Sequence, residues 1–335
     1  MINERVYKDY IAALLREIKA WGKKISRPVD TVYFGGGTPS VLGEDISLLM
    51  REIKNSFKLL PGAEITAECN PGCDTEFFTA AAKSGVNRLS LGVQAGNNAR
   101  LKALGRTHTA EDVLAAAAAA RQAGINNISC DIMIALPDSD LKTLKEDIDF
   151  VCSLSPAHIS AYILKIEQNT AFYKRRDSLN IPDDDSAADQ YLFLCRELKS
   201  RGFEHYEISN FALPAKKSRH NLKYWRCEEY LGLGPSAHSF LEGERFYYPR
   251  DLKGFIAGNT PISDGAGGKK AERIMLALRT DDGVAADELS PAAIKKAQTF
   301  KEAGLLEISG GRIVLNNEGM LVSNSIITEL LYEDL

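Results

Sequence analysis

Strand-like runs alternate with helix-like patterns along residues 4–202, and this alternation limits the possible folds more than any other feature. The helix-like segments are 4–22, 45–57, 74–84, 109–123, 139–153 and 184–202, and the strand-like ones are 31–34, 63–69, 88–94, 128–136 and 158–164. Strands and helices that alternate in this way are joined by right-handed crossovers and form a parallel sheet. The sequence therefore predicts an α/β fold whose sheet either stays open or curls into a barrel.

The residue pattern within the strands favours the barrel. Leu89, Leu91 and Val93 alternate with Ser90, Gly92 and Gln94, and the runs around Glu64–Glu68 and Cys130–Ile134 repeat this pattern. Period-two alternation places the two sets on opposite faces, whereas an open parallel sheet is apolar on both. The polar groups could simply satisfy one another in a packed core. We expect instead a partial parallel (β/α) barrel whose polar inner face lines a ligand cavity.

The last third of the chain has a different organisation. Residues 204–260 are expected to be a connecting region that is irregular over 204–240, and 255–268 is predicted to be a linker or loop. Helices at 269–279, 291–304 and 319–332, with a hairpin around 309–311, predict a small winged-helix-like α+β module. From residue 269 on there are eight Lys and Arg against eleven Asp and Glu, so we expect a packing or partner-docking role and no nucleic-acid binding. The expected domains are 1–203, 204–260 and 261–335.

Composition excludes several functional classes. A net charge of -4 argues against a polybasic nucleic-acid coat. The longest apolar run, 113–120, is far shorter than the roughly 20 residues of a membrane span, and no export signal opens the chain. Six scattered cysteines are typical of buried free thiols in a reducing compartment. We therefore expect a cytoplasmic protein with no membrane insertion; its oligomeric state is not predicted.

Polar residues end several of the predicted strands. Gly35-Gly36-Gly37 lets backbone N–H groups approach a ligand, although alone it could equally be a tight turn or a phosphate loop lacking its lysine. Glu68 and Gln94 close the next two strands, and Asp131 lies in the one that follows. Ligands of parallel barrels bind at the carboxyl ends of the strands. Together these groups suit an amino acid or a nucleoside, with Asp131 placed for ribose hydroxyls.

Longer motifs add a specific resemblance. They are Phe-Gly-Gly-Gly-Thr-Pro-Ser (34–40), Asn-Arg-Leu-Ser-Leu-Gly-Val-Gln (87–94), Leu-Gly-Arg-Thr-His (104–108), Tyr-Glu-Ile-Ser-Asn-Phe-Ala (206–212), Arg-His-Asn-Leu-Lys-Tyr-Trp (219–225) and Tyr-Leu-Gly-Leu-Gly-Pro-Ser-Ala-His (230–238). Over nearly its whole length the chain resembles the radical S-adenosylmethionine proteins related to oxygen-independent coproporphyrinogen III oxidase. The His-Asn-x-x-Tyr-Trp segment is similar to the HemW heme-chaperone branch.

The resemblance implies a set of S-adenosylmethionine contacts. Gly36, Gly37 and Thr38 match the loop that holds the methionine amino group, and Glu68 matches a carboxylate at that site. The further residues that match contacts of the oxidase are Gln94, Arg106, Asp131, Lys165 (through its backbone) and His238. Arg106 has an alternative reading, a surface salt bridge.

The chain departs from the family at the iron–sulfur motif. A [4Fe–4S] cluster is expected for the family, held by Cys-x3-Cys-x2-Cys after a first strand that this chain lacks, so the next strand edge is left unpaired. Cys69 and Cys73 have the first spacing, but the third position is Glu76, and we interpret the pair as unrelated to the cluster. Three explanations stay open: a gene start assigned too late, a shortened chain, or a cluster-less relative.

His220 is the candidate heme ligand. Imidazole ligates heme iron, and Tyr224 and Trp225 can pack against a porphyrin. A purely structural histidine is the alternative. The resemblance implies a heme chaperone that binds heme and S-adenosylmethionine and delivers heme to respiratory proteins. The competing functions are oxidative decarboxylation of coproporphyrinogen III, and a catalytically inert S-adenosylmethionine- or nucleotide-binding module.

Overall fold

The computed structural model describes residues 3–168 and 170–334. The helices of the first half are α1 (Glu4–Gly22), η1 (Pro39–Leu42), α2 (Asp45–Ser56), α3 (Glu76–Ser84), α4 (Asn98–Ala103), α5 (Ala110–Gln122) and α6 (Leu141–Ser153). The strands of this half are β1 (Val29–Phe34), β2 (Leu59–Cys69), β3 (Arg88–Gln94), β4 (Asn127–Ile134) and β5 (His158–Ile163). Each predicted segment of the alternation is present, and α4 was not predicted.

Beyond residue 170 the elements are shorter. The helices are α7 (Ala171–Arg175), η2 (Arg176–Ser178), α8 (Asp184–Ser200), α9 (Arg219–Trp225), α10 (Leu252–Ala257), α11 (Lys270–Ala277), η3 (Ala286–Glu288), α12 (Pro291–Glu302), α13 (Asn317–Leu321) and α14 (Ser323–Asp334). The strands are β6 (Glu204–Glu207), β7 (Asn210–Ala212), β8 (His238–Leu241), β9 (Glu244–Tyr247), β10 (Ile262–Ala266), β11 (Val284–Ala285), β12 (Leu306–Ser309) and β13 (Arg312–Leu315).

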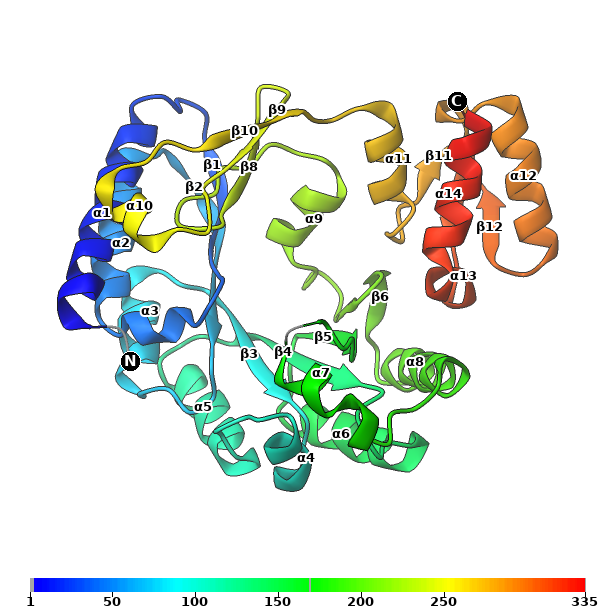
Figure 1. Cartoon of the computed structure of the whole chain (residues 1–335), viewed down its shortest axis with the longest axis horizontal. Coiled ribbons are helices and arrows are strands. Elements are labelled where there is room, and N and C mark those ends of the chain that lie inside the picture. Colours follow the sequence, from blue (N-terminus) through cyan, green and yellow to red (C-terminus); the bar gives the residue numbers. More distant parts are fainter. Residues whose placement is uncertain (1–2, 169, 335) are drawn as a thin grey trace.

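The main sheet is a curled half-barrel, as predicted. Its seven strands follow the order β1-β2-β3-β4-β5-β7-β6, and the first five are parallel. Helices cover its outer side, and the strands curve around an interior (Figure 1). The prediction that 204–212 is irregular was wrong: β7 pairs antiparallel with β5, and the buried rings of Tyr206 and Phe211 anchor the two added strands.

The two faces of the sheet differ as the alternation predicted. Leu89, Leu91 and Val93 are fully buried and belong to the large apolar cluster formed with the surrounding helices. The neighbouring side chain of Ser90 lies on the other face and bonds to Asp131 there. Burying each such aliphatic side chain contributes about 1.5–3 kcal/mol, so the outer face supplies most of the stabilisation. The inner face is free to carry polar groups.

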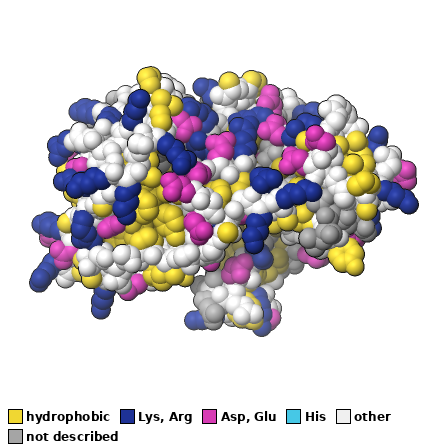
Figure 2. Space-filling model, turned by 90° about the horizontal axis from the view of Figure 1, so that it is seen from above, with side chains coloured by type: hydrophobic (Ala, Val, Ile, Leu, Met, Phe, Trp, Pro, Cys, Tyr) yellow, Lys and Arg dark blue, Asp and Glu magenta, His cyan; other side chains and the backbone are white. Residues whose placement is uncertain are grey.

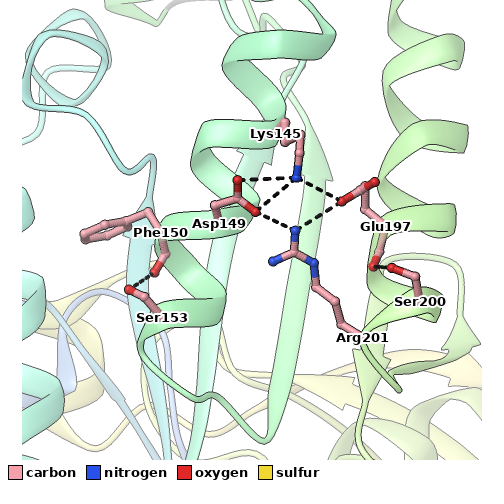
Figure 3. Close-up of polar contacts among 7 residues, drawn as sticks. All are labelled: Lys145, Asp149, Phe150, Ser153, Glu197, Ser200 and Arg201. Atoms are coloured by element: carbon pink, nitrogen blue, oxygen red, sulfur yellow. Dashed lines mark hydrogen bonds and ion pairs between the residues drawn. The ribbon is translucent and has the colours of Figure 1, made fainter.

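A network of charged side chains joins α6 to α8 on the outer side (Figure 3). Lys145 Nζ lies 3.3 Å from a carboxylate oxygen of Asp149 and 3.4 Å from one of Glu197. Arg201 contacts the same two carboxylates, at 3.1 Å for Glu197. All four side chains are at least a quarter exposed, so the network contributes little to stability compared with the core beneath it.

The segment 255–268, predicted to be a linker or loop, instead contains the end of α10 and strand β10 of a second sheet. Strand β10 pairs with β9, which pairs with β8, and α10 packs against α1. Residues 262–266 are all exposed, so they lack the apolar alternation by which a strand can be recognised. Hydrogen bonds between β9 and β10 thus cross the predicted boundary at position 260. Those between β5 and β7 cross the predicted boundary at position 203. The domain boundaries themselves stay predictions.

The C-terminal module has its own core. The strands β11, β13 and β12 form a three-stranded sheet that packs with α11, α12 and α14 around Ile274, Leu278, Ile313 and Leu330. The single helix expected over 319–332 is two helices, because the chain leaves helical geometry at Val322, where ψ is 21°. A β-bridge between Glu207 and Thr280 is among the contacts that link the module to the edge of the barrel sheet.

The surface carries charges of both signs. Figure 2 shows basic and acidic side chains interspersed over the face that is seen from above, without a continuous basic stripe. In the part of the chain that the structure describes, no helix combines the length and apolar character needed to cross a bilayer.

Candidate functional site

The glycine loop and Glu68 meet at the carboxyl ends of β1 and β2. The Gly36 N–H donates to Glu68 Oε2 at 3.0 Å, and the Tyr33 hydroxyl donates to Glu68 Oε1 at 2.9 Å. Gly36 has a φ of 80° and Gly37 a φ of 67°, which glycine adopts without strain. Residues 35–38 are exposed, so the loop is open to solvent. This corner can hold an ammonium group against Glu68.

Asp131 lies deeper on the same inner face. The Ser90 hydroxyl donates to its carboxylate, lying 3.1 Å from either oxygen. Burial raises the pKa of Asp131 to about 6, although hydrogen bonds from Ser160 and Ser90 favour the charged form. Because Ser90 is also the register partner of Glu68, the two carboxylates lie on inner-face positions of β2 and β4 with only β3 between them.

Gln94 ends β3 in the left-handed region with a φ of 68° and is half-buried. This backbone turns the chain sharply at the barrel mouth, the edge where β1 to β5 end. Glu68 and the glycine loop border the same edge, so three of the predicted ligand groups lie along it.

The other predicted contacts are less closely grouped. Arg106 is exposed in the connection between α4 and α5, and Lys165 follows β5 with a side chain that is 85% exposed and 3.5 Å from Glu167. His238 begins β8, in the second sheet, where its exposed ring stacks on Tyr247. Within the described residues no contact links these three side chains to Glu68 or Asp131. Their roles stay predictions.

His220, on α9, packs against the first strand of the barrel. Its Nδ1 lies 2.8 Å from Thr31 Oγ1, its Nε2 lies 2.9 Å from the Tyr224 hydroxyl, and the ring stacks on Tyr33. Burial lowers the pKa of His220 to about 4. The imidazole is therefore neutral at physiological pH, the form that ligates iron, and both its nitrogens are engaged.

A buried carboxylate fixes the start of α9. Glu64, on the inner face of β2, accepts the backbone N–H of His220 at 2.9 Å and that of Arg219 at 3.2 Å. The preceding residue, Ser218, caps the helix by accepting the N–H of Asn221. These N–H groups have no partner within the helix, so Glu64 and Ser218 together satisfy them and hold His220 at the barrel wall.

A buried chain of hydrogen bonds supports the same region. Ser129 Oγ lies 2.7 Å from Nδ1 of His158, whose Nε2 lies 2.8 Å from the Tyr206 hydroxyl. The Ser218 N–H donates to that hydroxyl at 3.1 Å. Burial holds the pKa of His158 well below its usual value, so the ring is neutral. These hydrogen bonds connect β4, β5 and β6 to the N-cap of α9.

Arg88 is the inner-face residue that the sequence analysis missed. It is 2% exposed, and its Nε and Nη2 have no hydrogen-bond partner within 3–168 and 170–334. In the sheet register Arg88 lies beside Thr66, whose hydroxyl also lacks a partner there. The signal was present, since Arg88 shares its face with Ser90 and Gln94. A buried cation whose N–H groups lack hydrogen-bond partners is costly, so this position suits an anionic group of a ligand.

The residues present do not fit an iron–sulfur cluster. No group of three or more His, Cys, Asp or Glu side chains among the described residues is arranged to hold a metal ion. Cys69 and Cys73 lie close together, but the third position of the motif is Glu76, an exposed carboxylate on α3. A cluster with one open iron needs three thiolates, and this part of the chain offers two.

The chain is similar in sequence to proteins of a known family. The radical SAM superfamily model matches residues 2–151. The chain is 33% identical to the heme chaperone HemW of Mycobacterium tuberculosis over 96% of its own length and 86% of that protein. For HemW of Lactococcus lactis the identity is 32%, with coverage of 97% and 90%.

One solved structure shares the fold over nearly the whole chain. The radical SAM enzyme coproporphyrinogen III oxidase (HemN) of Escherichia coli superposes with a TM-score of 0.81 at 21% identity, covering 98% of this chain and 85% of that one. At this identity the match shows the fold alone. The inner-face groups, the α9 segment and the level of identity to the curated relatives lead to one conclusion: the chain belongs to the HemW family of heme chaperones within the radical SAM superfamily.

Proposed function

We propose that this protein is a cytoplasmic heme chaperone that binds heme at α9 through His220 and delivers it to heme-requiring respiratory proteins. The single observation that carries the proposal is the neutral imidazole of His220, held against strand β1 by Thr31, in a chain of the HemW family. Six unpaired cysteines suit a reducing compartment.

The hydrogen bonds of His220 support a ligand role. With its proton on Nδ1, the ring donates to Thr31 Oγ1, which fixes the ring orientation, and Nε2 accepts from the Tyr224 hydroxyl. The lone pair of Nε2, which faces the Tyr224 hydroxyl, is then the one that would bind iron. Tyr224 is 39% exposed. Heme binding at Nε2 therefore requires displacement of one hydroxyl and no change of protonation.

The surroundings of His220 suit a flat, apolar cargo with carboxylate groups. Tyr33 stacks on the His220 ring, and Tyr224 meets Tyr230 edge to face, at 4.6 Å between ring centroids. Heme carries two propionate carboxylates, and Arg88 Nε and Nη2 have no hydrogen-bond partner among the described residues. In this proposal the aromatic rings pack against the macrocycle and Arg88 receives a propionate.

S-adenosylmethionine is proposed to bind at the barrel mouth. Gly36, Gly37 and Thr38 would face the methionine end and Glu68 its ammonium group, with Gln94 and Asp131 toward adenosine. Arg106, Lys165 and His238 complete the proposed contacts. The support is the exposed loop held by Glu68 and the half-buried carboxylate of Asp131. The oxidase alternative has no observation in its favour beyond the shared fold.

The test is a heme titration followed by absorbance. We expect a shifted Soret band in the parent chain, and in His220→Ala a weaker affinity with a changed spin state. Tyr224→Phe is the matched variant, since it removes only the hydroxyl that competes for Nε2 and should bind heme at least as tightly as the parent. His238→Ala controls for the exposed histidine of β8. An unchanged spectrum and affinity in His220→Ala would contradict the site.

A further inference from the structure

Two cysteines outside the proposed ligand sites lie in sulfur–sulfur contact. Cys69 ends β2, Cys73 lies in the following turn, and their Sγ atoms are 3.1 Å apart. The Cys73 N–H donates to the Asn70 carbonyl at 3.0 Å, which closes the turn and brings the sulfurs together. A disulfide bond is about 2.05 Å long, so a movement of roughly 1 Å joins the two atoms.

The two thiols have different surroundings. Cys69 is 5% exposed and belongs to the apolar cluster beneath the helices, whereas Cys73 is half-buried and can be reached from solvent. A hydrogen bond from the Cys69 thiol, helped by Ser40, lowers the pKa of Cys73. The same bond, together with burial, raises the pKa of Cys69. Cys73 is therefore the nucleophile of the pair and Cys69 the resolving thiol.

We propose that Cys69 and Cys73 form a redox-active dithiol that small-molecule disulfides oxidise to an intramolecular disulfide. The Cys73 sulfur attacks one sulfur of the small disulfide, which releases one thiolate and leaves a mixed disulfide on Cys73. The Cys69 sulfur then loses its proton and attacks the Cys73 sulfur, which releases the second thiolate. Two protein S–H groups are oxidised, and the small disulfide is reduced to two thiols that take up the two protons.

The two cysteines lie beside the segments that form the barrel mouth. Glu68, which holds the glycine loop, immediately precedes Cys69. The Asn70 N–H, inside the Cys69–Cys73 turn, lies 3.3 Å from Ser40 Oγ on η1, which follows the glycine loop. The Cys69–Cys73 turn thus lies next to both segments that form the mouth, so oxidation of the two thiols would change the backbone that holds the mouth. Among the described residues no other pair of cysteines is in hydrogen-bond contact.

The experiment is a thiol-trapping assay on the full chain. The reduced protein is incubated with oxidised glutathione, quenched in acid, alkylated and digested with trypsin. Trypsin cuts after Lys58 and Lys83, so both cysteines lie in the single peptide 59–83. We expect this peptide to escape alkylation and to be lighter by two hydrogens. Dithiothreitol should restore two alkylation sites.

Variants separate the two thiols. Cys69→Ser should trap a glutathione adduct on Cys73, because the resolving thiol is gone, and Cys73→Ser should leave the buried Cys69 reduced. Cys152→Ser is the matched control, since Cys152 is also half-buried, and it should behave like the parent. Alkylation of both thiols in the oxidised parent chain overturns the proposal, as does a glutathione adduct that persists there on Cys73.

Discussion

Glu64 and Glu68 lie four residues apart on the same face of β2, and both accept backbone N–H groups, yet their surroundings differ. Glu64 is 7% exposed and accepts two N–H groups of α9, so its carboxylate is enclosed by protein. Glu68 is half-buried at the mouth and accepts one N–H of an exposed glycine loop. The comparison shows that one inner face carries two kinds of carboxylate. Glu64 holds α9, where heme is proposed to bind, whereas Glu68 is open to a ligand.

Removal of the enclosed carboxylate should have the largest effect. Glu64→Ala leaves the N–H groups of Arg219 and His220 without an acceptor at the barrel wall, so we expect the free energy of unfolding to fall by about 2–4 kcal/mol. Urea denaturation measures this loss, with the exposed Glu302→Ala as control. A loss no larger than that of the control would show that α9 does not depend on Glu64.

Asp131, a third carboxylate of the inner face, should make the stability of the fold depend on pH. Its pKa is raised to about 6, so the folded state binds its proton more tightly than the unfolded state does. This contribution to stability is present below the ordinary pKa and is lost as the pH rises through about 6. Asp131→Asn should therefore gain about 1–3 kcal/mol relative to the parent chain between pH 4 and pH 7. Equal pH profiles in denaturant titrations would contradict the raised pKa.

Glu68→Ala should affect binding more than folding. We expect the free energy of S-adenosylmethionine binding to weaken by about 1–3 kcal/mol, as for a lost hydrogen bond to a charged group. The free energy of unfolding should change by less than about 1 kcal/mol, because the carboxylate lies at the mouth. Calorimetry and urea denaturation measure the two quantities, with the exposed Glu76→Ala as control. If Glu68→Ala destabilises the chain as much as Glu64→Ala, the distinction between the two carboxylates fails.

The smallest effect is expected on the outer side. Lys145→Met removes one cation from the network between α6 and α8, in which Arg201 still contacts both carboxylates. The free energy of unfolding should change by less than about 1 kcal/mol and the change should shrink in high salt. A large, salt-independent loss in urea denaturation would contradict the small contribution expected of these exposed ion pairs.

The fold could be predicted because its signals are local. The alternation of Leu89, Ser90 and Leu91 is read within one strand, and it correctly separated the core from the inner face. Strand β10 was missed because residues 262–266 are exposed and lack that alternation.

The division of the inner face could not be predicted. The partner of Glu64 is the start of α9, 155 positions along the chain, and no local pattern distinguishes it from Glu68. Arg88 was visible as a polar position, but its lack of a partner is a property of the packed structure. Such long-range pairings are what separate an enclosed carboxylate from an open one.

The most direct test of two separate ligand regions is to titrate both ligands into Glu68→Ala and His220→Ala by calorimetry and absorbance. The account predicts a crossover: Glu68→Ala loses about fivefold or more in S-adenosylmethionine affinity and keeps heme, whereas His220→Ala loses heme affinity and keeps S-adenosylmethionine. If either substitution weakens both ligands equally, or weakens the opposite ligand, the mouth and α9 are not separate sites and the account is contradicted.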